Sequence, residues 1–393
     1  MTPLSGVTQD EVRRANLSLV LTLLHRHGAQ SRSQIVATTG LNRSTVGDLV
    51  SELVEAGLVR ESAGVGGGVG RPSLRVEPVA DAATVLALDV RVERTVAAVI
   101  GLGGTVFVRR ERAHDIPDEQ ALMSEVCAIA RQVLAEGPGA GSWVGTGAGV
   151  PGVVRTHDGL VRFAPNLGWV DAPFGERVAQ GLGGNRPVSV RNDADLGVLA
   201  EHLRGAARDS DTVVYLSGDI GIGGGLLIDG RPLVGAGGYG GEVGHMQVNP
   251  AGRVCRCGAV GCWETEIGWN ALARDTGAPD AEAAFAQALA GEPQARAAVR
   301  RVADWLGVGL VNIVNVVNPQ AIVLGGHLGR VYSMEGGRVE QRLGSALPAP
   351  REQARIRVGS LGTDATLVGA GEVAFTHLLA DPVGVLARLD RAS

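Results

Sequence analysis

Residues 254–264 read VCRCGAVGCWE and contain three of the four cysteines of the chain, and His245 lies a short distance upstream. Three thiolates and one imidazole make up the complete tetrahedral shell of a structural zinc ion, which leaves no position open for a reacting water. Glycines between the cysteines permit the tight turn that such a shell requires. The pattern therefore predicts a structural Zn2+ site formed by His245, Cys255, Cys257 and Cys262. The alternative is a set of buried, reduced cysteines.

Acidic and amide side chains flank this motif. Glu242 precedes the histidine by three residues, and Glu264 follows the last cysteine by two. Asn192 and Asp193 come directly after a short apolar run, and Asn166 belongs to the turn-rich segment APNLGW. A polyhydroxylated ligand needs such a mixture, because each hydroxyl both donates and accepts hydrogen bonds. Any one of these residues taken alone would be read as solvated surface.

Beyond residue 80, apolar runs separated by glycines alternate with segments of helical periodicity. This alternation predicts α/β layers, arranged as two lobes with a ligand cleft between them. The predicted strands are 85–90, 95–100, 105–108, 143–150, 188–190, 213–216, 226–228 and 321–324, and the longest predicted helices are 119–135 and 295–317.

The first 76 residues have a different pattern, which predicts three short helices. Leu17, Val20, Leu21 and Leu24 recur at helical intervals, and a glycine ends that helix. Ser31 and Gln34 have the form of a capping box for a second helix, and Asn42 can cap a third. Helix, glycine turn and helix make the geometry that presents a reading helix to the major groove.

The charge of this segment supports a DNA-binding role. Residues 12–75 contain eight arginines against four acidic residues, whereas the whole chain has a net charge of −5. A glycine-rich stretch ending in Gly-Arg-Pro (70–72) predicts a two-stranded wing whose Arg71 can enter a minor groove. The alternative is a small helical packing module with a flexible linker. The predicted DNA-contacting residues are Ser31, Arg32, Asn42, Arg43, Ser44, Thr45 and Arg71.

Several classes of protein are disfavoured. No uninterrupted apolar run approaches the ~20 residues of a membrane span. The amino terminus has no charged-then-apolar segment with a small-residue cleavage site. A cytoplasmic location, without a membrane partner, is therefore expected.

The segment from residue 213 to 264, with GIGGG (221–225), Glu-x-Gly-His and CxCGxxGCxE, resembles the ROK family of bacterial sugar kinases and sugar-responsive repressors. The resemblance extends over nearly the whole chain, through GVPG (149–152), NLGW (166–169) and Asn318-Pro319. It implies an α/β fold of the actin-like ATPase type, with two RNase-H-like lobes. An amino-terminal winged helix is the mark of the family's repressor branch, which is similar to xylose and N-acetylglucosamine regulators.

The resemblance also implies roles for single residues. By this resemblance, five residues of the chain would hydrogen-bond a sugar, and Asn166 and Gly152 are weaker candidates. His245 would bind zinc through one ring nitrogen and face the sugar with the other. In the family's kinases the residue matching Asp193 is the general base. The five expected sugar ligands are Asn192, Asp193, Glu242, His245 and Glu264.

The chain departs from the kinase pattern where the nucleotide would bind. Kinases of the family have Asp-x-Gly-Gly-Thr after the first strand, and here Asp89 is followed by Arg91, Val92 and Glu93. These side chains fill the space that bare backbone leaves for phosphates, and Glu93 adds unfavourable charge. The kinases have a second phosphate-binding segment, Gly-Thr, before the Gly-Ile-Gly run, and here Asp219-Ile220 stands in its place. We therefore expect no enzymatic activity, with an ATP-dependent hexose kinase as the alternative.

Together these patterns predict a sugar-responsive regulator, most simply a repressor, that leaves a palindromic operator when sugar binds. A repressor controlled by a protein partner is a second alternative. The resemblance implies a homodimer or a homotetramer. The expected domains are 1–76 for the winged helix-turn-helix and linker, 80–192 with 372–393 for the first lobe, and 193–371 for the second lobe, with the zinc knuckle and the dimerisation surface.

Overall fold

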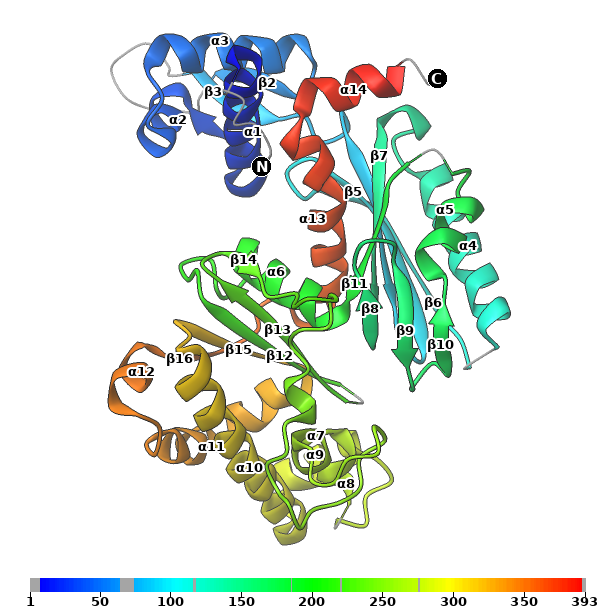
Figure 1. Cartoon of the computed structure of the whole chain (residues 1–393), viewed down its shortest axis with the longest axis vertical. Helices are drawn as coiled ribbons and strands as arrows, with labels where there is room; N and C mark the ends of the chain where they lie inside the picture. Colours follow the sequence, from blue (N-terminus) through cyan, green and yellow to red (C-terminus); the bar gives the residue numbers. More distant parts are fainter. Residues whose placement is uncertain are drawn as a thin grey trace, which may run out of the picture. The chain divides into compact units, whose positions relative to one another are not determined.

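The computed structural model describes residues 8–63, 74–115, 118–184, 186–219, 221–274 and 276–390 (Figure 1). The chain divides into two compact units, and each is considered separately. Unit 1 comprises Met1–Ala148, Pro173–Val190 and Ala370–Ser393, and unit 2 comprises Gly149–Ala172 and Arg191–Gly369. Residues 149–172 therefore belong with the second unit, whereas the expected lobe boundaries placed them in the first. None of the described helices is long and apolar enough to cross a membrane.

The amino-terminal part of unit 1 contains the three helices expected from the sequence, followed by a two-stranded wing. Four apolar residues of the first helix, Leu17 to Leu24, are buried as its periodicity predicts. The wing strands pair antiparallel, and a short strand before the second helix joins the wing sheet in the order β1-β3-β2. The elements are α1 (Gln9–His27), β1 (Gln30–Ser31), α2 (Arg32–Thr39), α3 (Arg43–Glu55), β2 (Val59–Ala63) and β3 (Leu74–Pro78).

Local hydrogen bonds explain where these helices begin. Ser31 and Gln34 form the predicted capping box, and Asn42 Oδ1 accepts from the Thr45 N–H at 2.8 Å. A further capping box, between Thr8 and Glu11, starts α1. Gly40 ends α2 in the left-handed conformation that glycine adopts at low cost. The predicted helix-turn-helix geometry is therefore present.

The rest of unit 1 is built on a five-stranded sheet of order β11-β7-β4-β5-β6. Its first three strands in sequence form an antiparallel meander, and two later strands extend it on the other side. The strand predicted at 105–108 runs on to Ala113. The strands are β4 (Thr84–Val90), β5 (Arg94–Gly101), β6 (Val106–Ala113), β7 (Trp143–Val150) and β11 (Val188–Asn192). The helices α4 (Glu119–Glu136), α5 (Phe174–Gly181) and α14 (Pro382–Asp390) and the greater part of α13 (Ala365–Ala380) complete this part.

Unit 2 repeats the same strand order in its sheet β14-β13-β12-β15-β16. Here too an antiparallel meander is extended by two strands, both parallel to β12. The elements are β12 (Val213–Gly218), β13 (Ile222–Ile228), β14 (Arg231–Pro232), β15 (Ala321–Gly325), β16 (Arg355–Val358), α6 (Asp193–Leu203), α7 (Trp263–Ile267), α8 (Trp269–Ala273), α9 (Ala281–Leu289), α10 (Pro293–Val317), α11 (Gly326–Leu343) and α12 (Pro348–Gln353). The two sheets thus share one topology, as the predicted duplicated α/β fold requires.

The glycine run 223–225 lies inside β13, which is longer than the strand predicted at 226–228. A Cβ on Gly225 would come within 2.2 Å of the Ala194 carbonyl oxygen, so helix α6 packs directly on the backbone of this strand. The run is therefore required for close helix-to-sheet packing. A small sheet of β8 (Val153–Arg155), β9 (Leu160–Ala164) and β10 (Trp169–Ala172) was not predicted.

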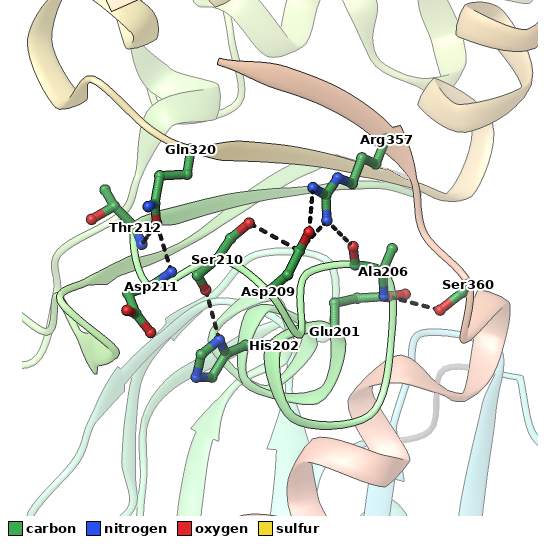
Figure 2. Close-up of polar contacts among 10 residues, drawn as sticks. All are labelled: Glu201, His202, Ala206, Asp209, Ser210, Asp211, Thr212, Gln320, Arg357 and Ser360. Carbon is green, nitrogen blue, oxygen red and sulfur yellow. Dashed lines mark hydrogen bonds and ion pairs between the residues drawn. The ribbon is translucent and has the colours of Figure 1, made fainter. Parts of the chain in front are cut away.

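Polar side chains fix the loop that connects α6 to β12 (Figure 2). Arg357 of β16 donates to the Ala206 carbonyl oxygen at 2.6 Å and to Asp209 Oδ2 at 3.0 Å. The side-chain oxygen of Gln320 accepts from the backbone N–H groups of Asp211 and Thr212 at 2.7 and 3.0 Å. The carboxyl end of α6 is thereby tied to strands β15 and β16.

Candidate functional site

The four predicted metal ligands lie together in unit 2. One ligand atom from each of His245, Cys255, Cys257 and Cys262 lies within 4.8 Å of the others. Cys257 Sγ and Cys262 Sγ are 3.7 Å apart, as are Cys255 Sγ and His245 Nδ1. A tetrahedral site with metal–sulfur bonds of ~2.3 Å has sulfur–sulfur edges of about 3.8 Å. The spacing therefore fits a tetrahedrally bound metal ion.

The backbone of the knuckle, residues 254–262, explains this convergence. A bridge between Val254 and Val260 closes the turn, and Gln247 pairs with Cys262 to bring the upstream segment alongside. A Cβ on Gly261 would come within 1.7 Å of the Asn249 carbonyl oxygen, so only glycine fits there. Burial raises the pKa of the Cys262 thiol to about 12, so a bound cation is what would favour its thiolate.

His245 presents its two ring nitrogens to different partners. Nδ1 faces the Cys255 sulfur, whereas Nε2 lies 3.9 Å from Glu242 Oε2. Burial raises the pKa of Glu242, His245 counteracts this, and the negative charge of Glu264 raises the pKa further. The imidazole thus stands between the cysteine cluster and an acidic side chain.

Glu264 links the knuckle to the sheet. Its Oε2 accepts from the Ile222 N–H at 3.0 Å, and its Oε1 lies 3.7 Å from Cys255 Sγ. A Cβ on Gly221 would come within 2.4 Å of Oε2, so glycine leaves room for this carboxylate. One oxygen of Glu264 is therefore committed to the protein, which gives the residue a structural role besides its predicted contact with sugar.

Asn192 and Asp193 stand at the amino-terminal end of α6. Asn192 Oδ1 accepts from the N–H groups of Ala194 and Asp195 at 2.7 and 3.3 Å, and its Nδ2 donates to the Gly152 carbonyl oxygen at 3.0 Å. These bonds leave one amide hydrogen of Asn192 for a ligand. Asn192 chiefly fixes the start of the helix, and the half-buried Asp193 follows it.

Asn166 lies in the turn between β9 and β10. Its Oδ1 accepts a short hydrogen bond from Arg256 Nη1, which comes from the knuckle between the first two cysteines. Gly152 adopts a φ of 109°, and a Cβ there would come within 2.4 Å of the Phe163 carbonyl oxygen. Gly152 therefore acts through its backbone. All the predicted sugar-binding residues belong to unit 2.

Two residues of this region were missed in the sequence. Arg256 could have been found in the sequence as a cation between two cysteines. Asp195 could have been found as a second acid in the first turn of a helix. Burial raises the pKa of Asp195 to about 7, the charges of Asp193 and Glu242 raise it too, and Arg191 opposes them. Asp193, Asp195, Glu242 and Glu264 thus form one electrostatically coupled group.

The pKa of Asp195 predicts a pH-dependent stability. Because the folded-state pKa is raised above the unfolded value, the stabilising proton is present at low pH and is lost between about pH 4 and pH 7. The wild-type free energy of unfolding should fall over this window, relative to Asp195→Asn, by up to about 1.4 kcal/mol per pH unit. Chemical denaturation of both proteins at pH 5 and pH 8 measures this difference. The exposed Glu352→Gln serves as a control, and parallel pH profiles for wild type and Asp195→Asn would contradict the prediction.

Four of the predicted DNA-contacting residues lie at the start of α3: Asn42, Arg43, Ser44 and Thr45. Arg43 is its first residue, is exposed, and has no ion pair or hydrogen-bonded side-chain partner among the described residues. Asn42, Ser44 and Thr45 are linked through the Asn42 cap, with Ser44 Oγ donating to Asn42 Oδ1 at 2.7 Å. Arg43 is therefore the side chain most available to a base edge.

The other predicted DNA-contacting residues are Ser31, Arg32 and Arg71, and the first two are bonded within the protein. Arg32 donates twice to Glu61 of the wing strand β2, at 2.7 and 3.0 Å, so it holds helix α2 to the wing. Ser31 is occupied as the cap of α2. Arg71, the predicted minor-groove residue, lies outside the described residues.

Unit 1 has an ion pair in the segment after β4, where the kinases of the family would bind the phosphates of a nucleotide. Asp89, almost fully buried at the end of β4, accepts from Arg91 Nε at 2.7 Å and lies 2.6 Å from Arg91 Nη2. Arg91, which we expect at the first glycine position of the kinase pattern, thus binds Asp89, which we expect at its aspartate position.

The amino-terminal helices, the two sheets of equal topology and the knuckle define a class: helix-turn-helix proteins whose body is an actin-like ATPase fold. The chain belongs to the ROK family, whose sequence profile matches residues 85–376. The profile of the IclR helix-turn-helix domain matches residues 16–63.

The relatives of this chain include proteins named as repressors and proteins named as glucokinases. A putative xylose repressor from Caldicellulosiruptor sp. (strain Rt8B.4) is 29% identical over 394 residues, covering 94% of this chain and 98% of the relative. A glucokinase from Halalkalibacterium halodurans is 30% identical over 249 residues, covering 58% of this chain and 75% of the relative. The solved structure of a ROK family transcriptional regulator, a homologue of the E. coli Mlc protein, has a TM-score of 0.80 at 24% identity, covering 97% of this chain and 100% of that one.

Proposed function

We propose that this chain is a transcriptional repressor that releases its operator when a sugar binds unit 2. The observation that carries the proposal is the presence, in one chain, of an exposed reading-helix arginine and an acidic site beside a His/Cys3 cluster. The xylose repressor relative spans both parts of the chain, whereas the glucokinase relative covers 58% of it. D-Xylose is therefore the first sugar to test.

In this proposal the sugar hydroxyls bind the acidic group of unit 2. Asp193 and Glu242 accept hydrogen bonds from hydroxyls, and His245 Nε2, on the side facing Glu242, contacts the same ligand. Asn166 accepts a hydrogen bond from Arg256 of the knuckle and remains a weaker candidate for contact with the sugar. Asn192 and Glu264, which are bonded to backbone groups, hold the other residues in position.

The ion of the His/Cys3 cluster is proposed to be zinc. Three thiolates and an imidazole suit Zn2+, and the reduced form of such a cluster needs a cation to hold its sulfurs together. Zinc would supply structural cross-linking of the knuckle and would fix the imidazole ring. Residues of the chain would do all the contacting of the sugar.

Operator binding would use two copies of the winged helix. Arg43 would read a base in the major groove, and a dimer or a dimer of dimers would place two reading helices on a palindromic site. Sugar binding would favour a conformation whose helices no longer match adjacent half-sites, through its higher affinity for that conformation. The proposed domains are a winged helix at 1–76 and two lobes, with residues 149–172 in the second lobe.

Glu242→Gln is expected to uncouple the repressor from sugar. Replacing a carboxylate that accepts hydroxyl hydrogen bonds costs about 1.5–3 kcal/mol, or roughly 10–100-fold in sugar affinity. Operator affinity without sugar should stay within about twofold, because Glu242 lies in unit 2 and far along the chain from Arg43. Calorimetry with D-xylose and gel shifts with and without it measure both quantities.

The exposed Glu352→Gln is the matched control for a lost surface charge. Loss of operator binding in Glu242→Gln would indicate folding damage, and normal release by sugar would remove Glu242 from the site. A wild-type protein that ignores every sugar, but is released by a cell extract, would favour control by a protein partner.

A second candidate function is an ATP-dependent hexose kinase, which the glucokinase relatives favour. The Arg91–Asp89 ion pair argues against it, because a kinase needs that segment open to phosphates and their metal. We expect no ADP release above background with glucose, xylose or N-acetylglucosamine. Turnover that Asp193→Asn abolishes would establish the kinase instead.

A further inference from the structure

Helix α13 is shared by both compact units. Its first residues, up to Gly369, belong to unit 2, and its remainder, from Ala370, belongs to unit 1. The helix is continuous over Ala365–Ala380, so one run of backbone hydrogen bonds joins its two ends. The contacts at its two ends therefore belong to one secondary-structure element.

The unit 2 end of α13 lies against α6, the helix that begins at Asp193 of the candidate sugar site. Thr366 Oγ1 donates to the Asp193 carbonyl oxygen at 3.4 Å. A Cβ on Gly369 would come within 2.1 Å of the Leu196 carbonyl oxygen, so the two helix backbones touch. The close approach therefore leaves no room for α6 to move towards α13 independently at this point.

The far end of α6 holds the segment that leads into α13 (Figure 2). Glu201 is fully buried, and its Oε1 accepts from the Leu361 N–H at 3.0 Å. Its Oε2 accepts from Ser360 Oγ at 3.2 Å and from the Ala206 N–H at 2.6 Å. Both ends of α6 are thus bonded to the region of residues 360–366, which makes α6 and the start of α13 one block.

The unit 1 end of α13 contacts the helix-turn-helix part of the chain. His25 of α1 is 0% exposed, and its Nε2 lies 3.2 Å from Oε2 of Glu372, which is 8% exposed. The Gly103 N–H donates to His25 Nδ1 at 2.9 Å, so Nδ1 is an acceptor and Nε2 carries the proton that Glu372 accepts. Phe375, one turn further along α13, packs on the imidazole with ring centroids 4.8 Å apart.

Helix α1 in turn supports the reading helix. Leu17, Leu21 and Leu24 of α1 are buried in the small core that also contains Val46 and Leu49 of α3. Arg13 of α1 also forms an ion pair with Glu52 of α3. The orientation of α3, and hence of Arg43, therefore follows that of α1.

We propose that the buried His25–Glu372 contact is the coupling contact through which α13 transmits the state of the sugar-site helix α6 to the reading helix. The inference rests on the proposed function. A buried carboxylate without its donor is costly, so this contact is either made or broken and does not weaken gradually. When α6 shifts, α13 either carries α1 with it or loses the bond, and both outcomes change the placement of α3. His25 and Glu372 are positioning residues, which touch neither sugar nor DNA.

Glu372→Leu tests the proposal, with Glu372→Gln as the conservative variant that can still accept from His25. The readout is the ratio of operator dissociation constants with and without saturating D-xylose, on an operator selected by the protein from random DNA. We expect this ratio to fall at least tenfold towards 1 in Glu372→Leu and to be partly restored in Glu372→Gln. The sugar dissociation constant without DNA should stay within about twofold. Arg388→Gln, at an exposed ion pair on α14, is the control.

A merely structural contact gives a different result. It would lower the melting temperature and weaken operator binding, while the ratio would keep its wild-type value, and that result would overturn the proposal. If Glu372→Leu fails to fold, the double variant His25→Leu with Glu372→Leu removes both polar partners and leaves no buried charge unpaired. The same ratio is then measured on the double variant.

A second measurement needs neither sugar nor operator, so it separates this inference from the proposed function. Gly369→Ala drives α6 and α13 apart, and amide hydrogen exchange reports on α1 and on residues 102–104. In the wild-type background, we expect Gly369→Ala to accelerate exchange in both segments. In the Glu372→Leu background, we expect Gly369→Ala to cause no further acceleration. An equal effect of Gly369→Ala in both backgrounds would overturn the coupling contact. A wild type that binds operator but responds to no sugar would contradict the proposed function alone.

Discussion

Cys262→Ser is expected to release the metal ion and to weaken sugar binding by at least about 100-fold. Cys262 is fully buried between the knuckle and α7, and a serine hydroxyl does not replace a thiolate as a zinc ligand at neutral pH. In the proposed zinc site the ion would orient the ring of His245 towards Glu242 and would anchor the start of α7 with Glu264, so its loss would disturb both. Atomic absorption of the purified protein measures the zinc, and calorimetry measures the sugar affinity.

Cys127→Ser is the matched control, because Cys127 is also buried but lies on α4 of unit 1, outside the cluster. It should keep its zinc and its sugar affinity. Operator binding without sugar should survive in Cys262→Ser, since the knuckle belongs to unit 2. A zinc-free Cys262→Ser protein that binds sugar like wild type would separate the knuckle from the sugar site.

Arg43→Ala is expected to weaken operator binding by about 5–150-fold and to relax base selection at one position of each half-site. The expected loss of 1–3 kcal/mol is that of a side chain making a bidentate contact with a guanine edge. Arg43 is available for it because it is exposed at the first position of α3, whereas Arg32 is engaged by Glu61. Gel shifts on operators randomised at single positions measure both effects.

Arg296→Ala, which removes an exposed arginine from α10 of unit 2, controls for the loss of positive charge. It should leave selectivity unchanged. If Arg43→Ala lowers affinity equally for every sequence, and reduces the salt dependence by about one unit, then Arg43 contacts phosphate and does not read a base.

Much of the fold and of the site was predictable because the signals are local. The capping box at Ser31, the Asn42 cap and the apolar spacing of α1 depend on residues within one or two turns of each other, and all three are present. The His/Cys3 cluster could be predicted because three of its four residues lie in one short loop. The β8–β10 sheet was missed, since its short strands have little periodicity.

The sequence by itself determined which segments become helices and strands, where the helix-turn-helix lies and which four side chains form a cluster that could hold a metal ion. Only the tertiary structure decided which polar groups are free to act. It pairs Arg32 with Glu61 and His25 with Glu372, and it raises the pKa of Asp195 to about 7. The physical reason is how far apart along the chain the interacting residues lie. Periodicity, capping and turn formation depend on neighbours in the chain, whereas burial, desolvation and the choice of a hydrogen-bond partner depend on residues that only folding brings together.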